Sequence, residues 1–460
     1  MKTFKPYTPD QPFLLPPVLQ DWLPEDHLAA FLSEVVDTAL DLTPILATYA
    51  TGDGRGQPPY HPALLVKLLL YGYCTGKPSS RQIELATYEE IPYRVLAANQ
   101  HPDHDTLAAF RQTHLPALAA LFIQVLRLCQ RAGLVKLGHV ALDGTKVLAN
   151  ASKHKAMSYG RMPETEQRLE QEIAALLAEA QRVDAAEDAQ YGKGKRRDEL
   201  PAELARRESR LAKIRAAKAE LEAEARAEAE AAAKAHAKRA ERGRQTRETG
   251  RKPKGPAPTV PDPTQATPDP KAQRNFTDPE SRIMKDGATK GFVQAYNAQA
   301  AVDGTAQVIV AADVTQEAND KGQLVPMLTQ VDGNCGAPPT AASGDAGYFS
   351  EAAVTHAALD GIDLYVAPDR QNHGDAPAPP ADDGTVRGAM RAKLQTAAGH
   401  AVYALRKAIV EPVFGQIKAA RGFRRFSVRG FAKVQAEWQL ICLTHNLLKL
   451  FRAGWRPQVA

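Results

Sequence analysis

Cysteine is scarce in this 460-residue sequence, and its spacing excludes two kinds of site. The four cysteines are Cys74, Cys129, Cys335 and Cys442, and no two of them form a CxxC pair. Closely spaced pairs are typical of structural zinc sites, and an even set in a short secreted chain indicates a disulfide framework. Neither pattern is present, so we expect the cysteines to be buried as small hydrophobic residues.

Long apolar runs are also missing. No stretch approaches the roughly 18 apolar residues of a membrane-spanning helix. Residues 1–24 are interrupted by prolines and contain no continuous apolar core, which argues against a signal peptide. We therefore expect a cytoplasmic protein that does not associate with membranes.

Charge is nearly balanced, with a net value of +5, but it is unevenly distributed. Residues 403–433 alone carry +7, from eight basic residues against Glu411, and the rest of the chain carries −2. Such a segment forms either a solvated helix face or a surface for phosphate backbones, whose binding depends on cationic neutralisation. Four interleaved phenylalanines favour the second interpretation: Phe414, Phe423, Phe426 and Phe431.

The length predicts more than one domain, because single cores rarely exceed about 250–300 residues. Residues 1–135 have helical patterns. An apolar helix over 61–73 begins near Pro62, and Ser79 or Ser80 is expected to cap a second helix from Arg81. This pair is either a DNA-reading module or a simple packed bundle. A further helix over 105–132 places its core residues at helical spacing: Leu107, Phe110, Leu115, Leu118, Phe122, Val125 and Leu126.

From Gly138 the apolar pattern indicates strands. We predict strands over 140–149, 291–302 and 306–314, a short strand ending at Asp345, and a strand over 362–367. Asp303-Gly304-Thr305 is a hairpin signal, a helix is expected over 319–331, and Ser350 is expected to cap another. This order predicts an α/β core with a mixed sheet flanked by helices, as in RNase H-like folds.

A charged insert interrupts this core. Residues 161–248 are dominated by Ala, Glu, Arg and Lys, and they predict two helices joined by a Gly/Lys loop at 191–195 in a coiled-coil-like hairpin. Two Pro-rich segments have the composition of linkers. The expected organisation is a helical, DNA-binding N-terminal domain at 1–135, an RNase H-like domain at 136–160 and 273–371, the helical insertion at 161–248, linkers at 249–272 and 372–390, and a catalytic helix with a basic helical tail at 391–460.

Three separated carboxylates lie in settings typical of an active-site edge. Asp143 and Asp345 each end an apolar, strand-like run, and Glu411 lies in the basic helical segment. Phosphodiester chemistry needs an activated attacking oxygen and a stabilised leaving oxygen, which two divalent ions held by carboxylates provide. Magnesium prefers such oxygen ligands, and manganese is an alternative. We therefore expect Asp143, Asp345 and Glu411 to be catalytic and to bind two Mg²⁺ ions.

Other acids compete for these roles. Asp303 has a sufficient explanation as a turn residue, Asp313 ends a predicted strand and is the strongest rival, and Asp369 follows the last strand. The carboxyl ends of parallel strands favour Asp143 and Asp345.

The surroundings of Glu411 leave its helix geometry open. Tyr403, Lys407 and Lys418 fall roughly on its helix face. Pro412 directly follows Glu411, so either one helix kinks there or a new helix begins with Pro412 in its first turn. In the second case Glu411 would lie at a helix N-terminus, which favours its ionised form.

Several stretches resemble the DDE transposases of bacterial insertion sequences, in the broad IS-four-like group. The matching stretches are 141–146 (ALDGTK), 343–350 (SGDAGYFS), 403–430 (YALRKAIVEPVFGQIKAARGFRRFSVRG), and, in the N-terminal part, 60–84 (YHPALLVKLLLYGYCTGKPSSRQIE) and 101–115 (HPDHDTLAAFRQTHL).

The resemblance implies an RNase H-like domain in which Asp143, Asp345 and Glu411 bind two magnesium ions, while water or a 3′-hydroxyl attacks DNA. It implies double-stranded DNA as partner, a homo-oligomer on DNA, and location on the nucleoid when bound. Lys418 matches the family's lysine, and Arg406 and Lys407 compete for the arginine position. The expected phosphate-binding residues are Tyr403, Arg406, Lys407, Lys418, Arg424 and Arg425.

The leading hypothesis is a DNA transposase that cuts element ends and joins them to target DNA. One alternative is a catalytically silent DNA-binding relative. Another is a metal-dependent nuclease without strand transfer.

Overall fold

The computed structural model describes residues 18–50, 58–191, 201–248, 262–287, 289–369 and 384–457. The chain divides into two compact units, one of residues 1–147 and 297–460 and one of residues 148–296. The boundaries fall within strands β1 and β5. The predicted Gly/Lys loop beyond Tyr191 and most of both predicted linkers lie outside the described residues.

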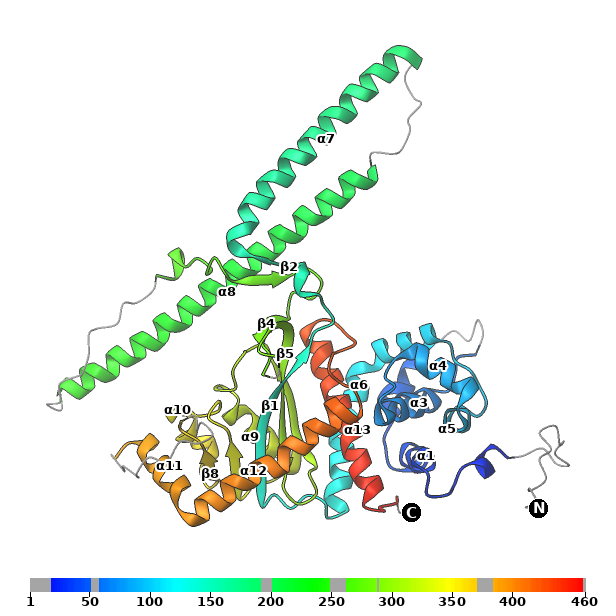
Figure 1. Ribbon diagram of the computed structural model, residues 1–460, viewed down its shortest axis with the longest axis vertical. Helices are drawn as coiled ribbons and strands as arrows, with labels where there is room; N and C mark the ends of the chain where they lie inside the picture. Colours follow the sequence, from blue (N-terminus) through cyan, green and yellow to red (C-terminus); the bar gives the residue numbers. More distant parts are fainter. Residues whose placement is uncertain are drawn as a thin grey trace, which may run out of the picture. The chain divides into compact units, whose positions relative to one another are not determined.

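The first unit contains a sheet in the order β6-β5-β1-β7-β8. Figure 1 labels β1, β5 and β8 of this sheet. β5 and β6 are antiparallel, whereas β1–β7 and β7–β8 are parallel. This mixed sheet, flanked by helices, fits an RNase H-like core and confirms the expected α/β class. The strands are β1(His139–Leu148), β5(Phe292–Asp303), β6(Ile309–Thr315), β7(Ala341–Gly344) and β8(Asp363–Val366).

The helices of this unit come from both ends of the chain. Those of the N-terminal part are α1(Leu28–Thr38), α2(Thr43–Leu46), α3(Pro62–Thr75), α4(Ser80–Glu89), α5(Ile91–Leu96) and α6(His104–Arg131). Those that follow β6 are α9(Leu324–Cys335), α10(Glu351–Val354), α11(Val386–Gln395), α12(Ala397–Gly415), a π-helical turn over Gln416–Ala420, and α13(Phe431–Arg452). α3 and α6 pack against α13, so the N-terminal helices and the C-terminal helix share one compact unit.

The N-terminal helices begin for identifiable reasons. Pro62 occupies the first turn of α3, where its missing N–H costs nothing. Asp103 caps α6 by accepting a hydrogen bond from the Thr106 backbone N–H at 2.6 Å, and the seven predicted core residues of α6 are buried. The capping prediction for α4 was wrong in detail: the helix begins at Ser80, and the Ser79 side chain at its N-cap accepts no hydrogen bond.

α13 is buried along most of its length and is not a basic tail. It packs on α6 and β6, and its Trp438 donates a hydrogen bond to the Gln299 carbonyl at 2.9 Å. The Asn446 side chain hydrogen-bonds both backbone groups of Ile309 in β6. Its Oδ1 accepts from the Ile309 N–H at 2.9 Å, and its Nδ2 donates to the Ile309 carbonyl at 2.8 Å. Cys74, Cys129 and Cys442 are buried as expected, whereas Cys335 is half-buried.

The second unit is built around two long helices (Figure 1). Glu172 of α7(Met162–Tyr191) pairs with Arg207 of α8(Pro201–Glu248) at 3.0 Å, and Glu166 pairs with Arg215 at 2.8 Å. Earlier residues of α7 thus meet later residues of α8, so the helices run antiparallel. Their apolar contact contains Met162, Leu169, Leu211, Ile214, Ala217 and Leu221.

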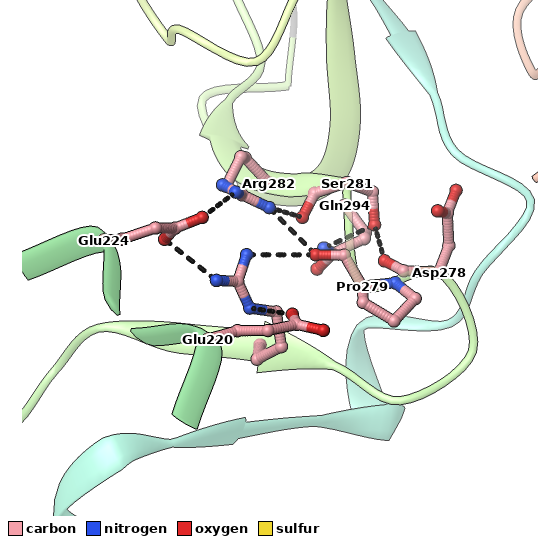
Figure 2. Close-up of polar contacts among 8 residues, drawn as sticks. Glu220, Glu224, Asp278, Pro279, Ser281, Arg282 and Gln294 are labelled. Carbon is pink, nitrogen blue, oxygen red and sulfur yellow. Dashed lines mark hydrogen bonds and ion pairs between the residues drawn. The ribbon is translucent and has the colours of Figure 1, made fainter. Parts of the chain in front are cut away.

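Short strands and two arginines join α8 to the rest of this unit. β2(Ala156–Ser158) pairs with β3(Gln273–Asn275), and β4(Arg282–Lys285) pairs with the first part of β5. Arg274 is 2% exposed, and its guanidinium meets Glu224 at 2.8 Å and Glu220 at 3.3 Å. Glu224 also meets Arg282 at 2.7 Å, and both arginines donate to the Pro279 carbonyl (Figure 2). The charge of the buried guanidinium is compensated by the two carboxylates, and only its Nη1 forms a hydrogen bond, to the Pro279 carbonyl.

None of the helices that the structure describes combines the length and apolar character that a bilayer crossing requires.

We expect Arg274→Ala to loosen α8, because it removes two ion pairs and leaves the Pro279 carbonyl with one donor fewer. The cost should be about 1–3 kcal/mol, since the glutamates remain half exposed to water. Hydrogen exchange of α8 amides in the full chain measures it. Arg168→Ala, which removes an exposed pair with Glu172, is the control and should change the opening free energy by less than about 0.5 kcal/mol. Equal exchange in both variants would contradict the prediction.

Candidate active site

Asp143 and Asp345 are brought together by the parallel pairing of β1 with β7. The last paired residues are Ala141 and Ser343. Each aspartate lies two residues further along its strand direction, so the same register places them level with each other. One part of the prediction was wrong: Asp143 does not end its strand, because β1 continues to Leu148. The pairing with β7, and not the strand itself, stops before Asp143.

The electrostatics of Asp143 reflect this proximity. Burial, the largest cause, and the negative charge of Asp345 together raise the pKa of its carboxyl group to about 7, while Arg406 opposes both. Asp320 also contributes to the increase. Like charges at close range favour the protonated form of one partner. The same environment suits a bound cation, which would relieve the repulsion.

The turn after β7 fixes Asp345. Its Oδ1 accepts a hydrogen bond from the Gly347 backbone N–H at 2.8 Å. Tyr348 is fully buried, and its hydroxyl donates to Oε1 of Gln299 on β5. Burial raises the pKa of Tyr348 well above its ordinary value, and the charges of the nearby acids raise it further. Tyr348 is therefore a neutral hydrogen-bond donor that anchors the turn.

Arg406, and not Lys407, faces the aspartates. The Arg406 side chain is 9% exposed, and its Nη1 lies 3.9 Å from Oδ2 of Asp143. Its guanidinium also lies 5.7 Å from the centre of the Tyr403 ring, and burial raises the pKa of that tyrosine. Lys407 is exposed. One helix turn of α12 thus places Tyr403 and Arg406 beside the first aspartate.

Lys418 reaches the continuation of β1. Its Nζ donates to Oγ1 of Thr145 at 2.9 Å and to the Lys146 carbonyl at 2.8 Å. Burial lowers the pKa of the neighbouring Lys146, whereas the charges of the nearby acids raise it. Lys418 therefore ties the π-helical turn after α12 to the strand that carries Asp143.

Glu411 is exposed on α12. Pro412 lies inside this helix, so Glu411 is not at a helix N-terminus, and that alternative was wrong. The charges that act most strongly on Asp143 belong to Asp345, Arg406 and Asp320, and Glu411 is not among them. Within the described residues, no group of three or more His, Cys, Asp or Glu side chains is arranged to hold a metal ion. The structure thus brings together two of the three predicted acids.

Asp320 is the acid that the sequence analysis did not identify. It lies between β6 and α9, and its Oδ1 accepts hydrogen bonds from Nδ2 of Asn297 at 2.7 Å and Nε2 of Gln299 at 2.6 Å. The alternation of Asn297 and Gln299 on one face of β5, where both side chains are fully buried, was the available signal. Buried amides in a strand require partners, and here the partner is a carboxylate.

The rival acids have other partners. Asp303 accepts from the backbone N–H groups of Leu137 and Thr305, as a hairpin residue should. Asp313 accepts from Gln435 of α13 at 2.7 Å. Asp369 pairs with Arg387 at 2.8 Å and Arg391 at 2.7 Å. These contacts account for the three carboxylates.

The basic segment after α12 combines core and surface residues. Arg424 and Arg425 are exposed, but Arg421 is buried and donates to Thr444 at 2.8 Å. Phe414, Phe423 and Phe426 are buried and Phe431 is half-buried, so three of the four interleaved phenylalanines belong to the core and do not support a nucleic-acid surface. Their spacing follows from packing against the core.

The donor set fits a hard divalent cation. Asp143 and Asp345 present anionic oxygens, which magnesium and manganese prefer, and their mutual repulsion leaves negative charge for a cation to neutralise. The cationic Arg406 balances only part of that charge.

An RNase H-like sheet with two aspartates level at its parallel strands is typical of enzymes that act on nucleic-acid phosphodiesters. The chain matches two family models: a transposase domain (DUF772) over residues 17–113, and a transposase DDE domain over residues 383–451. Together they support a DDE transposase of an insertion sequence, as the sequence motifs suggested. Transposases of that family generally depend on divalent metals and act on DNA. Neither matched range includes Asp143 or Asp345. No match was found among curated proteins or solved structures.

The raised pKa of Asp143 predicts a pH-dependent stability in metal-free buffer. A carboxyl group that holds its proton more tightly when folded makes the folded state less stable as pH rises from about 4 to about 7. Asp143→Asn removes this dependence, so the variant should gain roughly 2–4 kcal/mol relative to wild type between pH 4 and pH 8. Urea unfolding in EDTA measures it. A difference that is the same at both pH values would contradict the assignment.

Proposed function

We propose that this chain is a DNA transposase that cuts DNA at the ends of an insertion sequence and joins those ends to target DNA. The observation that carries the proposal is the level placement of Asp143 and Asp345 in an RNase H-like sheet, in a chain matched by two transposase domains. Paired carboxylates at such a site serve two-metal phosphodiester chemistry.

In this proposal Asp143, Asp345 and Glu411 hold two divalent cations, Mg²⁺ or Mn²⁺. When bound, the cations would activate the attacking water or 3′-hydroxyl and stabilise the leaving oxygen. Asp143 must lose its proton to act as a ligand, and Arg406 favours that loss because it lowers the pKa of this carboxyl group. Arg406 in turn keeps its orientation through Tyr403.

The cationic residues divide into two groups. Lys407, Arg424 and Arg425 are exposed and are available for DNA phosphates. Arg406 and Lys418 contact Asp143 and β1, so they act on DNA only close to the scissile phosphate. We also propose that the helical N-terminal domain at 1–135 binds DNA and that the α7–α8 hairpin is a coiled coil. A homo-oligomer would pair the two element ends.

Two alternatives remain as outcomes of the test. A catalytically silent relative would bind element ends without cutting them, and the presence of Asp143, Asp345 and Glu411 argues against it. A nuclease without strand transfer would release cut DNA without joining it to a target.

We expect Asp345→Ala to reduce Mg²⁺-dependent cleavage of DNA carrying the element ends by more than about 100-fold, because it removes a direct metal ligand. Binding of the same DNA in a gel-shift assay should stay within about threefold. The matched control is Asp313→Asn, because the carboxylate of Asp313 accepts from Gln435; this variant should cleave normally. Binding without cleavage by the wild type supports the silent relative, and cleavage without joined products supports the nuclease.

Glu411 has a separate expected outcome. If α12 presents it to a bound cation, Glu411→Gln should lose cleavage as completely as Asp345→Ala, whereas Lys407→Gln, an exposed change on the same helix, should weaken DNA binding and its salt dependence only. Single-turnover cleavage in Mn²⁺ distinguishes the two effects. Normal cleavage by Glu411→Gln would remove Glu411 from the metal site.

A further inference from the structure

Asp320 lies between the two segments that carry Asp143 and Asp345. A Cβ atom added to Gly144 would approach Oδ1 of Asp320 to 2.4 Å, and one added to Gly347 would approach Oδ2 to 3.3 Å. The carboxylate of Asp320 thus lies between Gly144, the residue after Asp143, and the turn after Asp345. Both glycines leave the room that this carboxylate occupies.

Its Oδ1 is the acceptor for two buried amides. Asn297 and Gln299 donate to it from β5 at 2.7 and 2.6 Å. Two further hydrogen bonds hold Gln299. Its side-chain Oε1 accepts from the Tyr348 hydroxyl, and its backbone carbonyl accepts from Nε1 of Trp438. A continuous chain of hydrogen bonds therefore runs from Asp320 through Gln299 to Tyr348, three residues after Asp345.

This chain fixes the Asp345 turn. All three side chains of the Gln299, Tyr348 and Trp438 group are fully buried, so a lost acceptor cannot be replaced by water without rearrangement. Without Asp320, the Nε2 of Gln299 would lose its acceptor, and because Nε2 and Oε1 belong to the same amide, a reorientation toward a new acceptor would also move Oε1 away from Tyr348. The turn that carries Asp345 would then lose its anchor.

We propose that Asp320 is a positioning residue, which sets Asp345 against Asp143 through Gln299 and Tyr348 and does not itself bind the metal. This inference rests on the proposed function only in that DNA cleavage is taken as the reaction that the site carries out. One feature favours positioning over ligation: Oδ1 of Asp320 already accepts hydrogen bonds from two buried amides.

Two substitutions separate these roles. D320N retains a side-chain oxygen that accepts both amide bonds and loses only the charge, whereas D320A loses the acceptor. Two readouts are measured on the full chain: Mn²⁺ affinity by electron paramagnetic resonance, and single-turnover cleavage of DNA carrying the element ends. Asp313→Ala is the matched control, because Asp313 pairs with Gln435 outside the chain of bonds.

We expect D320N to stay within about threefold of wild type in Mn²⁺ affinity and cleavage. D320A should lose about 10–100-fold in both, with its KM for DNA unchanged, as is typical when a residue supporting a metal ligand is removed. Should D320A fail to fold, Y348F tests the same chain and should weaken Mn²⁺ binding about 3–10-fold.

The proposal is overturned if D320N loses Mn²⁺ as fully as D143N does, which would make Asp320 a ligand, or if D320A and Y348F match wild type. If the wild type binds Mn²⁺ through Asp143 but cuts no DNA, the transposase proposal fails while the Mn²⁺ measurements still decide the role of Asp320. If the wild type neither binds Mn²⁺ nor cuts DNA, both proposals fail.

Discussion

The parallel register between β1 and β7 is the constraint on which the rest of the site depends. It sets two aspartates level with each other, and such a pair is unfavourable unless opposite charge or a proton compensates it. Arg406 from α12 supplies part of that compensation, and Lys418 ties the following turn to β1. Helix α12 therefore has an electrostatic reason to lie against this edge of the sheet, in addition to the burial of its apolar face.

Strand-level features could be predicted from the sequence because they depend on local patterns. Apolar runs that end in an aspartate, and an Asp-Gly turn between two strands, identified Asp143, Asp345 and the β5–β6 hairpin. The choice between Arg406 and Lys407 could not be made, since it depends on the rotation of α12 against the sheet. The π-helical turn over Gln416–Ala420 lies between Glu411 and Lys418, so the ideal helical spacing that placed Lys418 on the face of Glu411 does not apply across it.

Asp320 escaped prediction for a different reason. Its neighbours in sequence are polar and loop-like, and its importance appears only when β5 presents Asn297 and Gln299 to it. The buried phenylalanines after α12 show the reverse error, because residues that look like a surface beside many arginines are core. Local composition indicates the partner of an exposed residue, whereas tertiary packing decides whether the residue is exposed.

The side chain of Asn446 has a consequence for assembly. By donating to the carbonyl of Ile309 and accepting from its N–H, it imitates the backbone of an adjoining strand and occupies those groups of β6. A strand whose outer groups are already satisfied is a poor template for a strand of another molecule. Under the proposed homo-oligomer, copies of this chain are therefore expected to join through side-chain surfaces and not by pairing at this position of β6.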